Sequence, residues 1–98
     1  MALGDKYHRF TQYLQMKHAE GMDSITLTFP EIEKIWGFPI SDSMYRYAWA
    51  NDKTQSYSVG WMRADYVVTK CDLSEKKITF CHDPNRAANL LERERVTC

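Results

Sequence analysis

Residues 27–37, LTFPEIEKIWG, contain the signals for the end of a strand and the start and end of a helix. Thr28 and Glu31 have the S/T-x-x-E spacing of a capping box, in which each side chain accepts a hydrogen bond from the backbone N–H of the other residue. A helix is therefore predicted to begin at Phe29. Residues 25–28 alternate between apolar and polar side chains, which predicts a short strand leading directly into this helix.

The helix after the capping box is amphipathic and has a clear end. Ile32, Ile35 and Trp36 recur at intervals of three and four residues, so they share one face of the helix. Gly37 fits a left-handed C-cap, because glycine adopts a positive φ without a steric penalty. Pro39 follows and cannot continue a helix.

The composition is typical of one globular domain. The chain has 98 residues, of which 44% are hydrophobic, which suits a single core. We expect one domain over residues 1–98, with its core over about residues 5–83 and a short C-terminal helix or tail over residues 84–98.

Charge and hydropathy exclude several classes of protein. No segment approaches the ~20 apolar residues of a membrane span, and the N-terminus does not resemble a signal peptide, so a cytoplasmic protein without a membrane partner is expected. Thirteen basic residues balance thirteen acidic ones. The chain therefore lacks the large positive field of proteins that hold nucleic acids mainly through phosphates, and any such contact would have to be local.

The cysteines and histidines show no recognisable ligand motif. Cys71, Cys81 and Cys98 are an odd number without a C-x-x-C pair, so free thiols are expected. His8 and His18 are ten residues apart in a predicted helix. Two ligands on one helical face would be three or four residues apart, so solvated histidines are expected.

A metal site would need ligands from the predicted C-terminal hairpin. The candidates there are Cys71, Cys81, His82 and Asp83. In a hairpin centred near Ser74, Cys71 and Cys81 would lie nearly opposite each other. Two thiols and one histidine still lack the fourth ligand of a closed zinc site, so we predict no metal and no cofactor.

Apolar residues at intervals of three and four predict two further main helices. The first has about three turns and carries Tyr7, Phe10, Tyr13 and Leu14. The other, over residues 54–64, carries on one face Tyr57, Gly60, Trp61 and Ala64. A glycine on this face indicates close packing rather than a break.

Residues 66–82 predict a hairpin, because the runs YVVTKC and KITFC flank a polar segment. Asp83 and Pro84 resemble an N-cap and the first residue of a final helix. That helix of one or two turns would carry Ala87, Leu90, Leu91 and Glu94. An isolated hairpin is marginally stable, so residues 25–28 are expected to pair alongside it. The predicted fold class is α+β, with a small antiparallel sheet of about three strands packed against about three helices.

The sequence from Tyr7 to Phe80 resembles a widespread, uncharacterised family of small bacterial and phage domains. The family pattern reads LTFxEIExILGxxLPxS, then WWxND and AWxxAGW, and the matching pieces here are LTFPEIEKIWG, FPISDS, YAWAND and GWMRADYVV. The chain departs from the pattern with Trp36 in place of an aliphatic residue and Asp65 in place of a glycine. The resemblance implies a role in the bacterial and mobile-element arsenal, sometimes beside nucleic-acid-processing modules.

Residues 46–52 combine a guanidinium, aromatic rings and an amide, the groups that stack on bases and hydrogen-bond their edges or phosphates. Alternatively, Trp49 is a core residue, and Asn51 and Asp52 form a turn or helix cap. The candidate binding residues are Arg46, Tyr47, Trp49, Asn51, Lys53, Tyr57 and Arg63.

The sequence favours a non-enzymatic binding module. It has no GxSxG elbow, P-loop or HExxH motif, and Glu31 is already assigned to the helix cap. Neutral charge favours a protein partner, and aromatic residues expected at the surface, among them Tyr57 and Trp61, match the composition of interface hot spots. The expected setting is a nucleic-acid-related or bacterial defence pathway. The alternatives are direct nucleic-acid binding through Arg46, Tyr47, Trp49, Asn51 and Arg63, and a phage-encoded inhibitor of a CRISPR-Cas effector, an anti-CRISPR.

The C-terminal segment offers a second kind of interface. Ala87, Leu90 and Leu91 would form an apolar stripe on the final helix, with charged residues at its margin. This stripe would dock either on its own domain or on a second copy in a two-fold homodimer.

The capping box and the apolar helix face lead to a stability prediction. Thr28→Ala is expected to cost about 1 kcal/mol, because an early helical N–H loses its acceptor. Ile32→Ala is expected to cost more, roughly 2–4 kcal/mol, through lost burial and a cavity. Denaturant unfolding curves measure both changes, and an Ile32→Ala curve identical to the parent would contradict the assigned core face.

Overall fold

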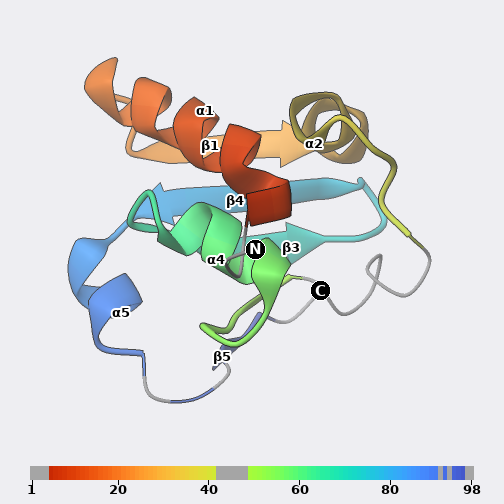
Figure 1. The fold of residues 1–98 in the computed structure, drawn as a ribbon. Coiled ribbons are helices and arrows are strands. Elements are labelled where there is room, and N and C mark those ends of the chain that lie inside the picture. The colour runs from red at the N-terminus through yellow and green to blue at the C-terminus, as the bar shows by residue number, and fades with distance from the viewer. Residues whose placement is uncertain (1–4, 42–48, 91, 93, 97–98) are drawn as a thin grey trace.

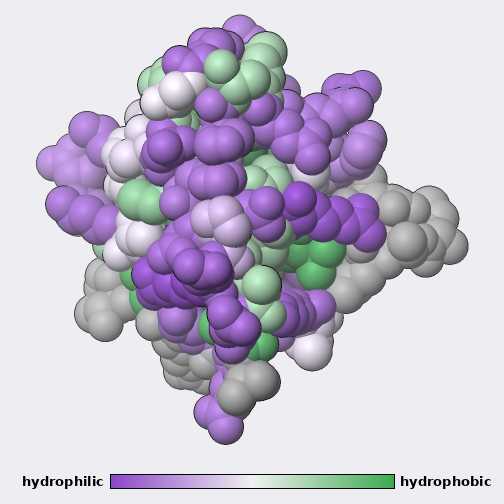
Figure 2. Space-filling model, turned by 90° about the vertical axis from the view of Figure 1, so that its left-hand side faces the viewer, coloured by the Kyte–Doolittle hydropathy of each residue, from purple (hydrophilic) through white to green (hydrophobic). Residues whose placement is uncertain are grey.

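The computed structural model describes residues 5–41, 49–90, 92 and 94–96 and has the predicted α+β architecture (Figure 1). The elements, in chain order, are a 3-10 helix η1 (Asp5–Tyr7), α1 (His8–Ala19), β1 (Ser24–Thr28), α2 (Phe29–Trp36), β2 (Ala50–Asn51), α4 (Ser56–Met62), β3 (Tyr66–Asp72), β4 (Lys77–His82), α5 (Pro84–Ala88) and β5 (Glu94–Arg95). None of the described helices is long and apolar enough to cross a membrane, and the face shown in Figure 2 is mostly hydrophilic.

The main sheet has three antiparallel strands in the order β1-β4-β3. The predicted hairpin and the pairing of residues 25–28 beside it are therefore confirmed. Ile25, Leu27 and Phe80 are buried on one face of this sheet, and α1 and α4 lie across that face (Figure 1). β2 and β5 form a separate two-stranded pair.

The hairpin is centred near Ser74, as predicted, but the predicted placement of Cys71 opposite Cys81 is wrong. Asp72 pairs with Lys77, and the Asp72 carboxylate accepts a hydrogen bond from the Glu75 N–H at 3.0 Å, so the loop is centred between residues 74 and 75. Cys71 consequently lies opposite Ile78, whereas Cys81 lies opposite Val67. A bulge between Val68 and Lys70 shifts the register further.

The expectation of three free thiols is also wrong. Cys71 is disulfide-bonded, and Cys81 is a free cysteine. An odd cysteine count without a close pair could not show this, because a disulfide depends on distance in space.

The capping box is present as predicted. The Thr28 hydroxyl accepts a hydrogen bond from the Glu31 N–H at 3.3 Å, and the Glu31 carboxylate accepts one from the Thr28 N–H at 2.9 Å. These bonds from the Thr28 backbone and side chain lower the pKa of Glu31. Gly37 ends α2 with φ 86°, the left-handed conformation expected there.

Asp65 adopts a left-handed backbone conformation, with φ 62°. Glycine adopts this conformation without strain, and aspartate tolerates it better than most residues.

The C-terminal segment is partly as predicted. The Asp83 carboxylate accepts a hydrogen bond from the Arg86 N–H at 3.1 Å and so caps α5. The helix ends at Ala88, however, and Glu94 lies in β5 opposite Asn51, which corrects the prediction of a helix continuing to Glu94. Ala87 is buried and Leu90 packs against the core, so this stripe contacts its own domain; Leu91 lies outside the described residues.

Gly60 allows α4 to approach the N-terminal helix closely, as the sequence predicted. A Cβ atom at position 60 would lie 2.7 Å from the Tyr7 Cβ, closer than real Cβ contacts. The Thr11 hydroxyl donates a hydrogen bond to the Gly60 carbonyl at 2.5 Å, which fixes the same contact.

This contact predicts that Gly60→Ala destabilises the domain. The added methyl group would push α4 away from Tyr7, and overpacking of this kind costs about 1–3 kcal/mol. The gain in helix propensity, roughly 1 kcal/mol, offsets only part of this cost. Gln55→Ala is the control in thermal and denaturant unfolding. Gln55 is the exposed N-cap of α4, and its side chain makes no capping hydrogen bond. A stabilised Gly60→Ala variant would contradict the close approach.

Candidate functional site

The predicted binding residues do not form one exposed surface. Arg46 and Tyr47 lie outside the described residues. Trp49 is only 2% exposed, and its ring stacks 5.3 Å from Phe29 and 6.1 Å from Trp61, between ring centroids. The alternative that Trp49 is a core residue therefore holds in this structure. Trp61, expected at the surface, is fully buried.

Asn51 is also buried, and its amide is fully used inside the domain. Its Oδ1 accepts hydrogen bonds from the Trp61 indole N–H at 3.0 Å and from the Val68 backbone N–H at 2.8 Å. Its Nδ2 donates to the Val68 carbonyl at 3.0 Å and to the Glu94 carboxylate at 2.8 Å. An amide has two donors and two acceptor sites, so no capacity is left for a base or phosphate.

The Asn51 amide binds Glu94, which also forms an ion pair with Arg86. Arg86 donates hydrogen bonds to the Glu94 carboxylate through Nε, at 3.1 Å, and through Nη2. Burial disfavours the ionised form of Glu94, but the hydrogen bonds from Arg86 and Asn51 outweigh it and lower the pKa of this carboxyl group. The network joins β2, β3, α4, α5 and β5, which makes the C-terminal segment part of the folded domain.

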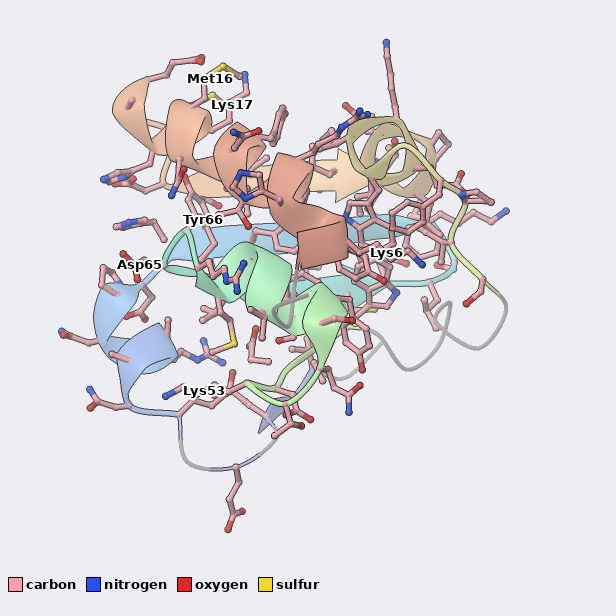
Figure 3. The ribbon with its side chains drawn as sticks, viewed as in Figure 1. Lys6, Met16, Lys17, Lys53, Asp65 and Tyr66 are labelled. Carbon is pink, nitrogen blue, oxygen red and sulfur yellow. The ribbon has the colours of Figure 1, made fainter. Side chains whose placement is uncertain are left out.

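The remaining predicted residues lie at the surface. Lys53 and Arg63 are exposed and line a hollow of about 280 Å³, with Asp65 at its margin (Figure 3). Lys53 donates a hydrogen bond to the Ala88 carbonyl at 2.9 Å. Tyr57 is half-buried, with its ring 6.0 Å from Trp61, between centroids.

A larger groove, of about 610 Å³, lies between α1 and α2. Met16 borders it and is 51% exposed, projecting from the side of α1 that faces away from the sheet (Figure 3). Arg9 and Lys34 are exposed at the same groove. The full lining consists of Arg9, Gln12, Tyr13, Met16, Glu31, Lys34 and Ile35.

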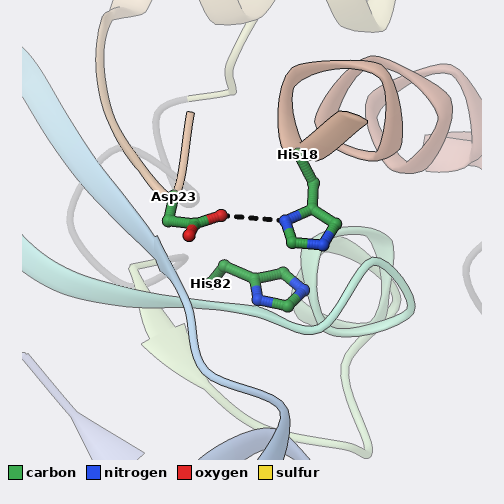
Figure 4. Close-up of side chains that lie close together, drawn as sticks. All are labelled: His18, Asp23 and His82. Atoms are coloured by element: carbon green, nitrogen blue, oxygen red, sulfur yellow. Dashed lines mark hydrogen bonds and ion pairs between the residues drawn. The ribbon is translucent and has the colours of Figure 1, made fainter. Parts of the chain in front are cut away.

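His18, Asp23 and His82 form a cluster that the sequence did not predict (Figure 4). His18 Nδ1 lies 2.8 Å from Asp23 Oδ1, and the His18 and His82 rings are stacked with centroids 3.8 Å apart. His82 belongs to β4, far from His18 in sequence, so helical spacing could not bring the two histidines together. The expectation that His18 is only solvated is therefore incomplete, because its side chain also contacts Asp23 and His82.

The Asn51 network predicts a structural rather than a ligand-binding role for this residue. Asn51→Ala would leave the Trp61 N–H and the Val68 backbone N–H and carbonyl without these partners, whereas Glu94 would keep its hydrogen bonds from Arg86. Each buried unpaired group costs about 1–3 kcal/mol. We expect denaturant unfolding to show a loss of several kcal/mol, or an unfolded chain, as the sum of these costs. Asp52→Ala serves as the neighbouring comparison. A folded Asn51→Ala protein of parental stability would contradict the network.

Comparison with known proteins places the chain in a family. No characterised protein and no solved structure matches the chain. Residues 7–83, which include α1, α2, α4 and the whole main sheet, match one described family. The chain therefore belongs to the family described as Domain of unknown function (DUF7662).

Proposed function

We propose that this domain is a non-enzymatic module that binds a protein partner through the groove between α1 and α2. The observation that carries the proposal is an open hollow of about 610 Å³ bordered by the half-exposed Met16 side chain. A concave surface lined by apolar side chains together with a few polar or charged groups is typical of a binding site.

The lining of the groove indicates the chemistry of its partner. Tyr13, Met16 and Ile35 supply apolar surface, and Arg9 and Lys34 supply positive charge. Tyrosine, methionine and arginine are enriched at protein interfaces. The proposed partner therefore presents apolar side chains flanked by acidic residues.

The charges around the groove favour an acidic partner segment. The α1 sequence, HRFTQYLQMKHA, contains no acidic residue. Glu31 lines the groove, but its carboxylate is held by the Thr28 cap, where it accepts hydrogen bonds from the N–H and the hydroxyl. Complementary charge across an interface raises the association rate and rejects unsuitable partners.

The biological setting of this proposal rests on the family resemblance. That resemblance associates such domains with nucleic-acid-processing modules and with bacterial defence or counter-defence. A component of such a system, including a CRISPR-Cas effector that the domain would inhibit, is the class of partner in which to search for an acidic docking segment.

Direct nucleic-acid binding is the second candidate, and the hollow beside Lys53 and Arg63 is the observation that favours it. Two residues of the predicted surface are buried, so in this conformation Trp49 cannot stack on bases and Asn51 cannot form hydrogen bonds with them. The balanced net charge also gives phosphates no general attraction. The protein-binding proposal therefore has the stronger support.

Selection from a displayed peptide library tests the groove without knowledge of the natural partner. The expected peptides combine acidic and apolar residues. Met16→Glu should weaken their binding, measured by fluorescence anisotropy, by about tenfold or more, since loss of a central contact costs more than about 1.4 kcal/mol. Met22→Glu is the matched control, because Met22 is a similarly exposed methionine, at 42%, that does not line the groove.

Two outcomes would reject the proposal. The first is equal loss of binding in the two methionine variants, which would mean that the groove has no special role. The second is retention on DNA or RNA at about 50 mM salt that falls steeply as salt rises and is lost in the Lys53→Ala, Arg63→Ala double variant. That result would identify the hollow at Lys53 as a nucleic-acid site.

A further inference from the structure

We infer that His18, Asp23 and His82 form a binding site for a divalent transition-metal ion, with zinc as the expected occupant. The site lies apart from the groove between α1 and α2 and does not depend on its function. His18 is in the last turn of α1, Asp23 is in the connection to β1, and His82 ends β4. One potential ligand atom from each residue lies within 4.8 Å of the other two.

The donor set suits zinc. Two imidazoles and one carboxylate are the three protein ligands of many catalytic zinc sites, in which water completes the coordination. The same set also binds other divalent metals, and the affinity of such sites generally rises towards copper. The residues are partly exposed, which leaves room for bound water.

One backbone bond and one side-chain hydrogen bond already hold the segments that carry Asp23 and His82 in place. The His82 N–H donates to the Asp23 carbonyl at 2.7 Å, which extends the pairing of β1 with β4 by one residue. The Tyr66 hydroxyl donates to the Met22 carbonyl at 2.6 Å, and so ties the connection before β1 to β3. Little chain entropy remains to be lost when an ion binds.

The electrostatic surroundings favour a cation. His18 lies at the C-terminal end of α1, where the helix dipole is negative. Asp23 contributes a carboxylate 2.8 Å from the His18 ring nitrogen. The neighbouring cation, Lys17, forms an ion pair with an acidic partner of its own, Glu20, at 3.5 Å.

Metal binding requires a limited rearrangement of side chains. The two imidazole rings are nearly parallel, with 8° between their planes, so one ion cannot lie in the plane of both while they stack. The His18 side chain is 49% exposed and Asp23 is 64% exposed, so both can rotate. His82 is held more firmly, because the Tyr66 ring packs against it edge-on at 5.2 Å.

The bound ion would join α1 to the main sheet. His18 comes from the helix. Asp23 and His82 lie next to each other at one end of the paired strands β1 and β4. A ligand that binds only the folded state stabilises it by mass action, so zinc should raise the unfolding temperature.

Calorimetric titration of the full chain with zinc chloride at neutral pH tests the site, together with thermal unfolding with and without zinc. We expect one zinc per chain. His18→Phe, His82→Phe and Asp23→Asn should each weaken binding by at least the roughly 10–100-fold that loss of an outer-shell partner costs. Phenylalanine keeps an aromatic ring in the stack while removing the nitrogen ligands.

His8→Phe is the matched control, because His8 is the remaining histidine and lies outside the cluster. Cys81→Ser tests whether the free thiol is a ligand instead. Both variants should bind zinc as the parent does. Circular dichroism of the metal-free proteins identifies any variant that fails to fold. If another variant fails to fold, His18→Phe still tests the site, because the His18 side chain is half-exposed and its replacement should leave the fold intact.

Three results would overturn the inference. Absence of zinc binding by the parent protein would exclude the site directly. An equal loss in His8→Phe would show adventitious binding by surface histidines. Loss of binding in Cys81→Ser, with a thiolate charge-transfer band in the cobalt-substituted parent, would place the metal at the cysteine.

Discussion

The Asn51 side chain pairs with the Val68 backbone as a neighbouring strand would, accepting from its N–H and donating to its carbonyl. The same amide binds the Trp61 indole and Glu94. Four segments that are distant in the sequence therefore meet at one buried group. Because a buried amide is costly unless every donor and acceptor is satisfied, the network requires β3, α4 and the C-terminal segment to be placed together. The arrangement of the two sheets depends on this requirement.

The aromatic core is built around the same point. Trp61 contacts Trp49, Phe80 and Phe10, with centroid separations of 6.1, 5.5 and 6.4 Å. The close approach at Gly60 brings Tyr7 into this cluster. Trp36 is the exception, because its buried indole N–H has no hydrogen-bond partner among the described residues.

The sequence predicted those features whose causes are local. Thr28 and Glu31 are close enough along the chain to specify a helix start, and the hairpin is a short-range structure. Gly60 also carries a local signal, because glycine disfavours a helix and its place on an apolar helix face indicates close packing. The centre of the hairpin near Ser74 was predicted, but the bulge after Val68, which shifts the pairing by one residue, was not. Asn51 could not be assigned to the core, because nothing near it in sequence shows that Val68 is its partner.

The candidate sites show the same distinction between local and distant causes. Met16 belongs to a helix that the sequence predicts. Its side chain borders a groove, however, only because α2 packs beside α1. His18 and His82 likewise meet because the C-terminal end of α1 packs next to the end of β4. Both sites depend on α1, which is anchored through buried Phe10 and Leu14 and through the Thr11 bond to α4. An ion at His18 would fix the end of the helix that those contacts leave exposed, and so would hold in place the helix that carries Met16.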